Sequence, residues 1–243
     1  LADLDERIAA DAGLPPLAAI IAQPQVRTLL EGVLGCSPYL TALILRHPHW
    51  LAAGLSTAPE LRLSELGNLL VSDLAAAQSK PEAMLALRRF KTEAALLIAL
   101  ADLGGVWPIM GVTAAITEVA DRALTHAVRF LMRSAASAGD LFPADPAHPE
   151  QGSGYIVLGM GKYGAHELNY SSDIDLIVFF ERGRARLRDG LEPETLFVRL
   201  TRDLVRLMQE RTPEGYVFRT DLRLRPDPGA TQIALSTAAA INY

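Results

Sequence analysis

Two aspartates near the end of the chain have the spacing of metal ligands. Asp173 and Asp175 lie two residues apart at the start of the apolar run Ile174–Phe180, which is typical of a strand. Successive side chains of a strand point to opposite faces, so both carboxylates project from one face, about 7 Å apart along the backbone. Two unpaired carboxylates at that spacing repel each other, and a divalent cation between them removes the repulsion.

Asp221 supplies a third carboxylate. It lies in the stretch Tyr216–Leu224, whose alternation predicts another strand. If that strand lies next to the first, the three aspartates form a cluster able to hold two Mg²⁺ (or Mn²⁺) ions about 4 Å apart. Such a cluster suits phosphoryl or nucleotidyl transfer, in which the protein supplies mainly placement and charge. Arg223 and Arg225 would share the face of Asp221 and either bind phosphate or pair with the aspartates.

A glycine pair precedes the aspartates. Gly159 and Gly161 follow a short apolar run that we expect to be a buried strand, and the backbone N–H groups of such a turn can face phosphate. Lys162 either contacts a phosphate or is a solvated loop lysine. Ser172 either orients Asp173, donates to phosphate, or only forms a turn.

The aspartates also allow a purely structural interpretation. An isolated Asp-x-Asp more often caps a turn and pairs with an arginine at a strand edge. Here a strand, a glycine turn, a short excursion and Asp-x-Asp occur in succession, and that combination favours a catalytic site.

The stretch Gly159–Gly164 also matches the dinucleotide-binding pattern G-x-G-x-x-G. That fold requires a full helix and a crossover of about a dozen residues or more before the next strand. Only the eight residues 165–172 separate this pattern from Asp173, so the spacing disfavours a dinucleotide site.

The order of predicted helices and strands indicates an α+β fold in two parts, which must position these residues. Residues 1–140 have helical periodicity throughout, including long helices over Glu82–Leu103 and Ala114–Ala138, and form an N-terminal α-helical bundle. Residues 141–153 are proline-rich and form a linker. Residues 154–243 combine the three strands with a helix over Glu192–Glu210 and form a small mixed sheet domain.

Bulk properties add weak constraints. The net charge of −5 does not indicate nucleic acid or a membrane surface as a partner. We expect the lone Cys36 to be a small buried hydrophobe. We also expect the protein to be in the cytoplasm, a reducing compartment. The chain begins at Leu1 rather than Met and stops at Tyr243 without a closing element, so we expect a fragment of a longer protein whose catalytic domain is truncated at its C-terminus.

Several basic residues have an open role. Arg88, Arg89 and Lys91 form a basic edge that we expect to be a solvated face, although it could contact the nucleotide or a partner protein. His166 is the histidine nearest the aspartates in the sequence, and we expect it to be an exposed loop residue.

Residues 158–177, with the sequence LGMGKYGAHELNYSSDIDLI, resemble the bacterial glutamine synthetase adenylyltransferase family. Residues 221–226 resemble the second motif of that family, and the segments Ser37–Leu40 and Arg46–Pro48 are similar to its helical N-terminal region. Proteins of the family carry two nucleotidyltransferase domains of the polymerase-β type, of which the N-terminal one removes AMP. This chain is similar to that N-terminal copy.

The resemblance implies a function and a set of roles. Inorganic phosphate would attack the adenylylated tyrosine of glutamine synthetase and release ADP, which regulates nitrogen assimilation. Asp173, Asp175 and Asp221 would be the metal ligands, and Gly159 and Gly161 the phosphate-facing turn. The implied partners are glutamine synthetase, nucleotide, phosphate and a nitrogen-signalling regulatory protein, with no nucleic acid and no membrane.

Two other functions remain open. The chain could be a catalytically silent module that keeps the fold for nucleotide sensing. It could also be an adenylyltransferase of the same fold that acts on another protein or a small molecule.

Overall fold

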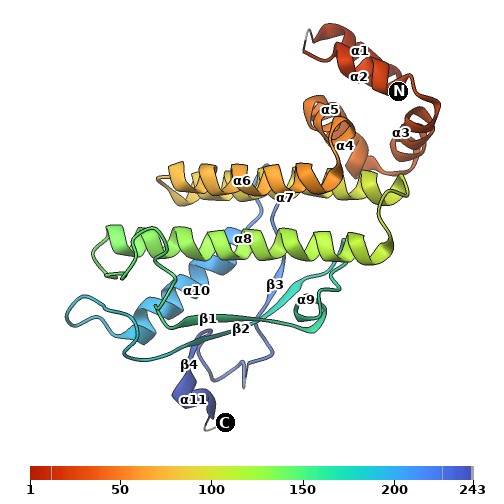
Figure 1. The fold of residues 1–243 in the computed structure, drawn as a ribbon. Helices are drawn as coiled ribbons and strands as arrows, with labels where there is room; N and C mark the ends of the chain where they lie inside the picture. Colours follow the sequence, from red (N-terminus) through yellow and green to blue (C-terminus); the bar gives the residue numbers. More distant parts are fainter. Residues whose placement is uncertain (12, 226, 242–243) are drawn as a thin grey trace. The chain divides into compact units, whose positions relative to one another are not determined.

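The structure is a computed structural model that describes residues 1–11, 13–225 and 227–241. It is an α+β fold, as predicted, in which a long helical region precedes a small mixed sheet (Figure 1). The helical region consists of α1 (Ala2–Ala10), α2 (Pro15–Ile21), α3 (Pro24–Cys36), α4 (Pro38–Arg46), α5 (Pro48–Ser56), α6 (Pro59–Ala76), α7 (Lys80–Leu103) and α8 (Ile109–Ser137). The sheet region consists of β1 (Tyr155–Met160), α9 (Gly161–Gly164), β2 (Ile174–Phe180), α10 (Pro193–Gln209), β3 (Thr220–Asp221), β4 (Leu235–Ser236) and α11 (Thr237–Ile241).

Proline marks where most of the short helices begin. Helices α2 to α6 and α10 each start at a proline, whose fixed φ suits the first helical turn and whose missing N–H has no partner there in any case. Between α3 and α4 only Ser37 lies outside the helices, and its hydroxyl accepts the N–H of Leu40 at 3.3 Å. The chain therefore turns between α3 and α4 at a single capping residue.

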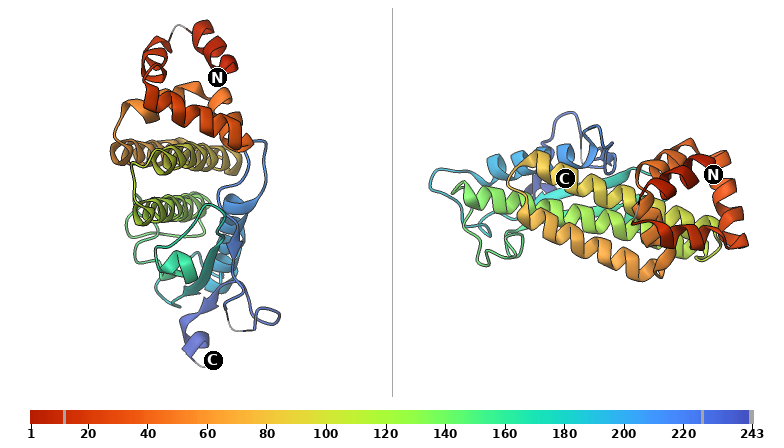
Figure 2. Two further views of the ribbon diagram at one scale, coloured as in Figure 1. Left: turned by 90° about the vertical axis from the view of Figure 1, so that its right-hand side faces the viewer. Right: turned by 90° about the horizontal axis from the view of Figure 1, so that it is seen from above.

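Contacts divide the chain into two compact units. The first comprises Leu1–Asn68 and Thr92–Val112, and the second comprises Leu69–Lys91 and Thr113–Tyr243. In the first unit, leucines and isoleucines from the short helices pack on the C-terminal half of α7, and the same short helices appear in red and orange in Figure 2. The most buried members of this core are Leu4, Leu14, Leu17, Leu30, Ile44, Leu51 and Leu96.

The boundaries between the units fall inside α6, α7 and α8, and not at residues 140–154. The N-terminal part of α7 and most of α8 bond to the sheet region, through Arg88 of α7 and Asp121 of α8. The predicted domains 1–140 and 154–243, with a linker at 141–153, thus differ from the units of packing and stay a prediction as domains.

The sheet of the second unit is built around β2. β1 pairs with β2 antiparallel along its full length, from Tyr155 opposite Phe180 to Met160 opposite Asp175. β3 and β4 both pair with β2 in parallel, β3 at its start and β4 at its end. Because β1 and β2 are antiparallel and α9 is a single turn, the sheet has no parallel β-α-β unit at the glycine pattern, which argues against a dinucleotide site.

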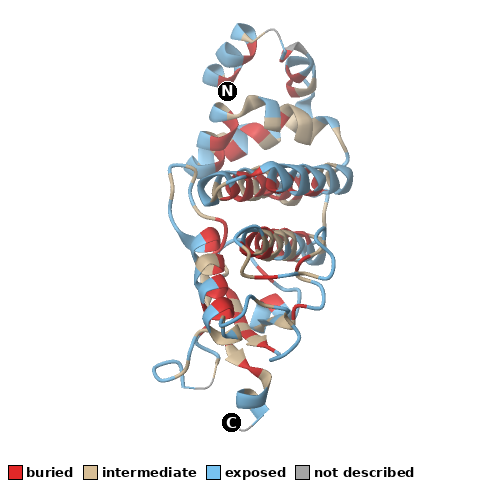
Figure 3. Cartoon of the chain, turned by 90° about the vertical axis from the view of Figure 1, so that its left-hand side faces the viewer, coloured by how far each residue is buried: buried red, intermediate tan, exposed pale blue. Residues whose placement is uncertain are grey.

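One face of the sheet is the core of this unit. Ile174, Leu176, Val178 and Phe180 of β2 are buried and alternate with partly exposed residues. The ring of Phe197 of α10 packs on that of Phe180 in a tilted arrangement, with centroids 5.2 Å apart, and stacks on Tyr155 of β1 at 5.4 Å. Figure 3 shows the buried side of α10 as a row of red residues.

Two predicted strands differ from the structure. β1 is an edge strand and not a buried one, because only β2 pairs with it, and Ile156 and Leu158 on its outer face are exposed. The third strand was predicted over Tyr216–Leu224, but only Thr220–Asp221 pairs with β2. Val217 and Phe218 instead donate their N–H groups to the carbonyl of Met208 at the end of α10, at 2.9 and 3.1 Å.

Two predictions about single residues are wrong. Cys36 is exposed, because it lies in the last turn of α3 on the side away from the core. Arg88 is fully buried and not part of a solvated face, since its guanidinium bonds to backbone carbonyls of the sheet unit. Its neighbour Arg89 is exposed, as expected.

Within the described ranges, no single helix combines the length and apolar composition of a membrane span. Helices α3 and α4 meet those criteria only as a pair, with a bend of 117° between them.

The aromatic contacts between α10 and the sheet predict a large stability effect. Replacing Phe197, which is 0% exposed, by alanine leaves a cavity against Phe180 and Tyr155. We expect Phe197→Ala to lower the free energy of unfolding by about 3–5 kcal/mol, measured by urea denaturation. The matched control is Phe142→Ala, since Phe142 is 47% exposed and only Arg186 lies over its ring. It should cost no more than about 1 kcal/mol, and equal losses would contradict this account of the core.

Candidate active site

The register of the sheet brings two of the three aspartates side by side. Asp175 of β2 lies directly opposite Asp221 of β3. Asp173 lies two residues before Asp175, immediately ahead of the first residue of β2, and is exposed. The face that carries Asp175 is the open one, since the alternate residues of β2 are buried against α10. Three acidic residues from two segments about 45 residues apart in the sequence therefore meet at one end of the sheet.

The charges of these aspartates act on one another. Partial burial raises the pKa of the Asp175 carboxyl above its ordinary value, and the negative charges of Asp173 and Asp221 raise it further. Arg223 opposes this shift and does not cancel it. An unneutralised negative field at Asp175 is what a site for a cation requires.

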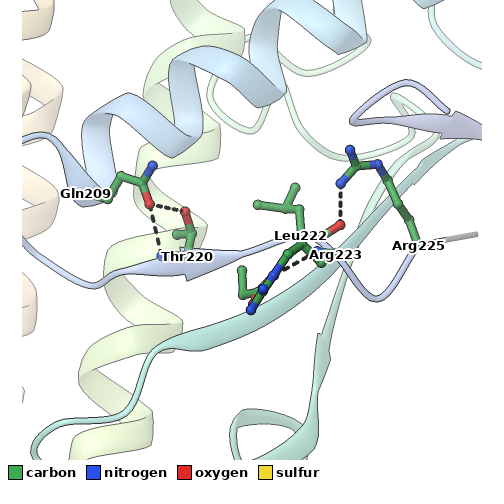
Figure 4. Close-up of polar contacts among 6 residues, drawn as sticks. Gln209, Thr220, Leu222, Arg223 and Arg225 are labelled. Carbon is green, nitrogen blue, oxygen red and sulfur yellow. Dashed lines mark hydrogen bonds and ion pairs between the residues drawn. The ribbon is translucent and has the colours of Figure 1, made fainter. Parts of the chain in front are cut away.

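Asp221 has the opposite environment. Arg223 binds its carboxylate with Nε at 3.0 Å from Oδ1 and 2.9 Å from Oδ2, and the Arg223 N–H donates to Oδ1 at 2.8 Å (Figure 4). These hydrogen bonds lower the pKa of the Asp221 carboxyl. Arg223 thus pairs with an aspartate of the cluster, which is one of the two roles that the sequence leaves open for it.

The chemical type of these ligands suits a hard divalent cation, but the three carboxylates do not point to a common position for one. Carboxylate oxygens are the ligands that Mg²⁺ and Mn²⁺ prefer. Among the residues that the structure describes, no three Asp, Glu, His or Cys side chains meet at a common point for a metal ion. The two oxygens of Asp221 face the guanidinium of Arg223.

The glycine turn lies directly against Asp175. Gly161 has φ +56, and a Cβ atom placed on it would lie 2.9 Å from Oδ2 of Asp175. Gly159 has no room for a side chain because the ring of Tyr163 lies beneath it, and Gly164 is pressed on the carbonyl of Gly159. Three glycines are therefore needed to fold the turn over residues 159–164 and to place it beside the carboxylate.

Two hydrogen bonds anchor this turn to α8. The hydroxyl of Tyr163 donates to Oδ1 of Asp121 at 2.6 Å, and burial and this carboxylate both raise the pKa of the phenol. The N–H of the buried Leu168 donates to Oγ1 of Thr117 at 3.4 Å. The turn and the loop that leads to β2 are thus each bonded to α8 at one residue.

The remaining predicted residues of this loop have local roles in the structure. Ser172 donates its hydroxyl to Oδ1 of Asn169 at 3.0 Å and accepts the Asn169 N–H at 3.2 Å, so it forms a turn before Asp173. Lys162 is exposed. His166 is exposed with φ +59, as expected for a loop residue.

Arg223 and Arg225 do not continue a strand. β3 ends at Asp221, so the expected alternation of residues 221–225 on one face is not observed. The guanidinium of Arg225 bonds to the carbonyl of Leu222 (Figure 4) and to that of Pro228 at 3.0 Å. Both arginines lie next to Asp221 with their guanidinium groups already engaged.

Sequence reasoning missed the residues that hold β3 in place. Oε1 of Gln209, the last residue of α10, accepts the Thr220 N–H at 3.3 Å and the Thr220 hydroxyl at 3.0 Å (Figure 4). The guanidinium of Arg219 donates to the carbonyl of Ser171 at 2.7 Å. Nothing in the spacing of Gln209 indicates its contact with a residue eleven positions later.

A helical region followed by a small mixed sheet, with paired aspartates on one strand, a third on its neighbour and a glycine turn beside them, defines a nucleotidyltransferase-like protein. Comparison with known families makes this specific. The chain belongs to the glutamate-ammonia ligase adenylyltransferase family, whose model matches residues 27–243.

Curated relatives agree with that assignment. A Rhodopseudomonas palustris protein is 52% identical over 220 residues, which cover 90% of this chain and 22% of the relative. A Bradyrhizobium protein is 50% identical over all 243 residues, covering 24% of its length, and a Xanthobacter autotrophicus protein is 51% identical over 223 residues. Each is named a bifunctional glutamine synthetase adenylyltransferase/adenylyl-removing enzyme. The chain spans less than a quarter of their length.

The close approach of Gly161 to Asp175 predicts a measurable strain. Gly161→Ala and Gly183→Ala both put a side chain at positive φ, but Gly183 has open space around its Cβ position. We expect each to lose about 1 kcal/mol of unfolding free energy, and Gly161→Ala to lose about 1 kcal/mol more through its contact with the carboxylate. Urea denaturation measures both. Adding Asp175→Ala to Gly161→Ala should recover the extra loss of unfolding free energy. Equal losses in the two single glycine variants would contradict the contact with Asp175.

Proposed function

We propose that this chain carries the site that removes AMP from an adenylylated tyrosine of glutamine synthetase by phosphorolysis. One observation carries the proposal. Asp175 and Asp221 lie opposite each other on neighbouring strands, with Asp173 immediately before the strand of Asp175 and a glycine turn against the Asp175 carboxylate.

Family membership supports the substrate. The relatives' names state both an adenylyltransferase and an adenylyl-removing activity toward glutamine synthetase. The chain matches less than a quarter of each relative, so the two activities could reside in different parts of such proteins. The motif Glu167–Asp175 resembles the adenylyl-removing copy, and we assign that activity to this chain.

The proposed reaction exchanges one phosphorus–oxygen bond for another. An oxygen of inorganic phosphate attacks the phosphorus of the AMP group, and the bond from that phosphorus to the tyrosine oxygen breaks. The tyrosine oxygen takes up a proton, and AMP leaves joined to phosphate as ADP. No strong general base is needed because phosphate already carries negative charge, which fits the absence of a role for His166.

The residues have distinct roles in this scheme. Asp173, Asp175 and Asp221 would hold one or two Mg²⁺ or Mn²⁺ ions, which when bound supply charge neutralisation for the phosphate groups. The N–H groups at Gly159 and Gly161 orient the phosphate, with Lys162 and Ser172 at the edge of the turn. Arg223 and Arg225 stand next to Asp221, where a guanidinium released from its present partner can bind phosphate.

A second candidate function is addition of AMP by the same site, with glutamine synthetase or another molecule as acceptor. The relatives' names include this activity. We further propose a cytoplasmic location and control by a nitrogen-signalling protein, both in keeping with glutamine synthetase as partner.

Removing a carboxylate should stop the reaction without unfolding the protein. We expect Asp173→Asn and Asp175→Asn each to lower ADP release from adenylylated glutamine synthetase, with phosphate and Mg²⁺, by about 100-fold or more in the complete protein. Asp189→Asn, an exposed aspartate in the loop after β2, is the matched control and should leave the rate unchanged. Circular dichroism checks the fold.

Chelation tests the metal separately. EDTA should abolish ADP release and added Mg²⁺ or Mn²⁺ should restore it, because carboxylates alone repel phosphate. Retained turnover in both aspartate variants would refute the site. Incorporation of labelled AMP from ATP, without ADP release, would favour the second candidate function.

A further inference from the structure

Arg88 is a buried cation bound by backbone carbonyls. It lies on α7, is 0% exposed, and donates through Nε to the carbonyl of Gly215 at 2.9 Å. Nη1 donates to the carbonyls of Met84 at 3.0 Å and Leu207 at 3.1 Å, and Nη2 donates to that of Glu210. Two of these carbonyls belong to the C-terminal end of α10, where the helix dipole favours a positive charge.

These hydrogen bonds fix the path of the chain after α10. Residues 212–215 form a tight turn in which Thr212 and Gly215 bond to each other through both backbone pairs, at 3.0 and 2.9 Å. Since Arg88 holds Gly215, the turn is tied to the helix end it follows. The buried Val217 and Phe218 then return along α10 and bond to the carbonyl of Met208.

Gln209 carries the same constraint to the site. It follows Met208 at the end of α10, and its side-chain oxygen accepts both the N–H and the hydroxyl of Thr220. Thr220 is the residue before Asp221 in β3. The contacts therefore run from Arg88 through the end of α10 to the neighbour of a site carboxylate.

β3 needs this support because its own pairing is minimal. It contributes two residues to the sheet, Thr220 opposite Ile174 and Asp221 opposite Asp175. β1, by comparison, pairs with β2 over six residues. A two-residue ladder that also sets two carboxylates side by side does not fix its own register against their repulsion.

We propose that Arg88 and Gln209 are positioning residues that hold Asp221 beside Asp175 for metal binding. The inference rests on the proposed function, which supplies the metal. It adds the residues that hold the metal ligands in place. Neither residue contacts the aspartates directly. Gln209 acts through Thr220, and Arg88 acts through the turn and the end of α10.

The decisive experiment uses Gln209, which is exposed and so can change without unfolding the unit. In the complete protein, Gln209→Ala should weaken Mn²⁺ binding, followed by electron paramagnetic resonance of free Mn²⁺, by about 10-fold or more. kcat for ADP release should fall similarly, with KM for adenylylated glutamine synthetase unchanged. Gln209→Glu should restore both, because a carboxylate accepts the same two hydrogen bonds. Gln151→Ala, the same change at an exposed loop glutamine, should have no effect.

Arg88→Lys extends the test to the other end of the chain of contacts. Lysine keeps the charge but cannot reach all four carbonyls, so we expect a loss of Mn²⁺ affinity in the same direction, measured well below its unfolding temperature. Arg89→Lys at the exposed neighbouring residue is the matched control. Amide hydrogen exchange of Thr220 gives a readout free of metal and substrate, and should accelerate about 10-fold or more in Gln209→Ala.

The outcomes separate the two proposals. If Asp175→Asn abolishes Mn²⁺ binding while Gln209→Ala leaves it and Thr220 exchange unchanged, only the positioning role is wrong. If Gln209→Ala lowers the unfolding midpoint but not Mn²⁺ affinity or kcat, its role is structural and the inference also fails. If Asp175→Asn leaves Mn²⁺ binding and turnover unchanged, the proposed function itself fails. Accelerated exchange of the Thr220 amide would then show only that Gln209 holds β3 in place, without a role in metal binding.

Discussion

Repulsion among three carboxylates is the constraint on which the site depends. Asp175 lies opposite Asp221 and two residues after Asp173, and their combined charge raises its pKa. A chain free to relax would separate these groups, because nearby like charges are unfavourable wherever water is partly excluded. The fold prevents this by fixing each segment from outside the cluster. The hydrophobic core beneath the sheet therefore has a second role, since the burial of Phe180 against Phe197 holds the strand that bears two of the charges.

The two strands of the site are held by different means. β2 has a neighbour along its whole length and a buried face, so Asp175 is placed by regular sheet structure. β3 has two paired residues and depends on the end of α10, through Gln209 and the carbonyl of Met208. Asp221 is thus the more adjustable of the two carboxylates. Any change at the C-terminal end of α10 acts on the distance between them, although it lies outside the cluster.

The sequence predicts the local parts of this arrangement and misses the non-local ones. The bounds of β2 match the apolar run Ile174–Phe180, and the structure places the predicted glycine turn beside Asp175. The length of the third strand was overestimated because its alternation is genuine, yet the N–H groups of Val217 and Phe218 are taken by a carbonyl of α10. Arg88 was misjudged for a similar reason. An arginine on a helix is usually solvated, but three of the four carbonyl partners of Arg88 lie 119 to 127 residues away in the sequence.

Arg223 explains why the metal ligands are not converged in the structure. The guanidinium meets both oxygens of Asp221 and lowers the pKa of its carboxyl, whereas Asp175 keeps a raised pKa beside it. A divalent ion would therefore meet little competition at Asp175 and direct competition at Asp221. Under the proposed function, a metal ion and Arg223 exclude each other at Asp221. A carboxylate oxygen that coordinates a metal cannot also accept the same guanidinium N–H in this geometry. Release of Arg223 would leave a positive, exposed group at the edge of the site at the moment when phosphate arrives, so one ion pair can serve both states.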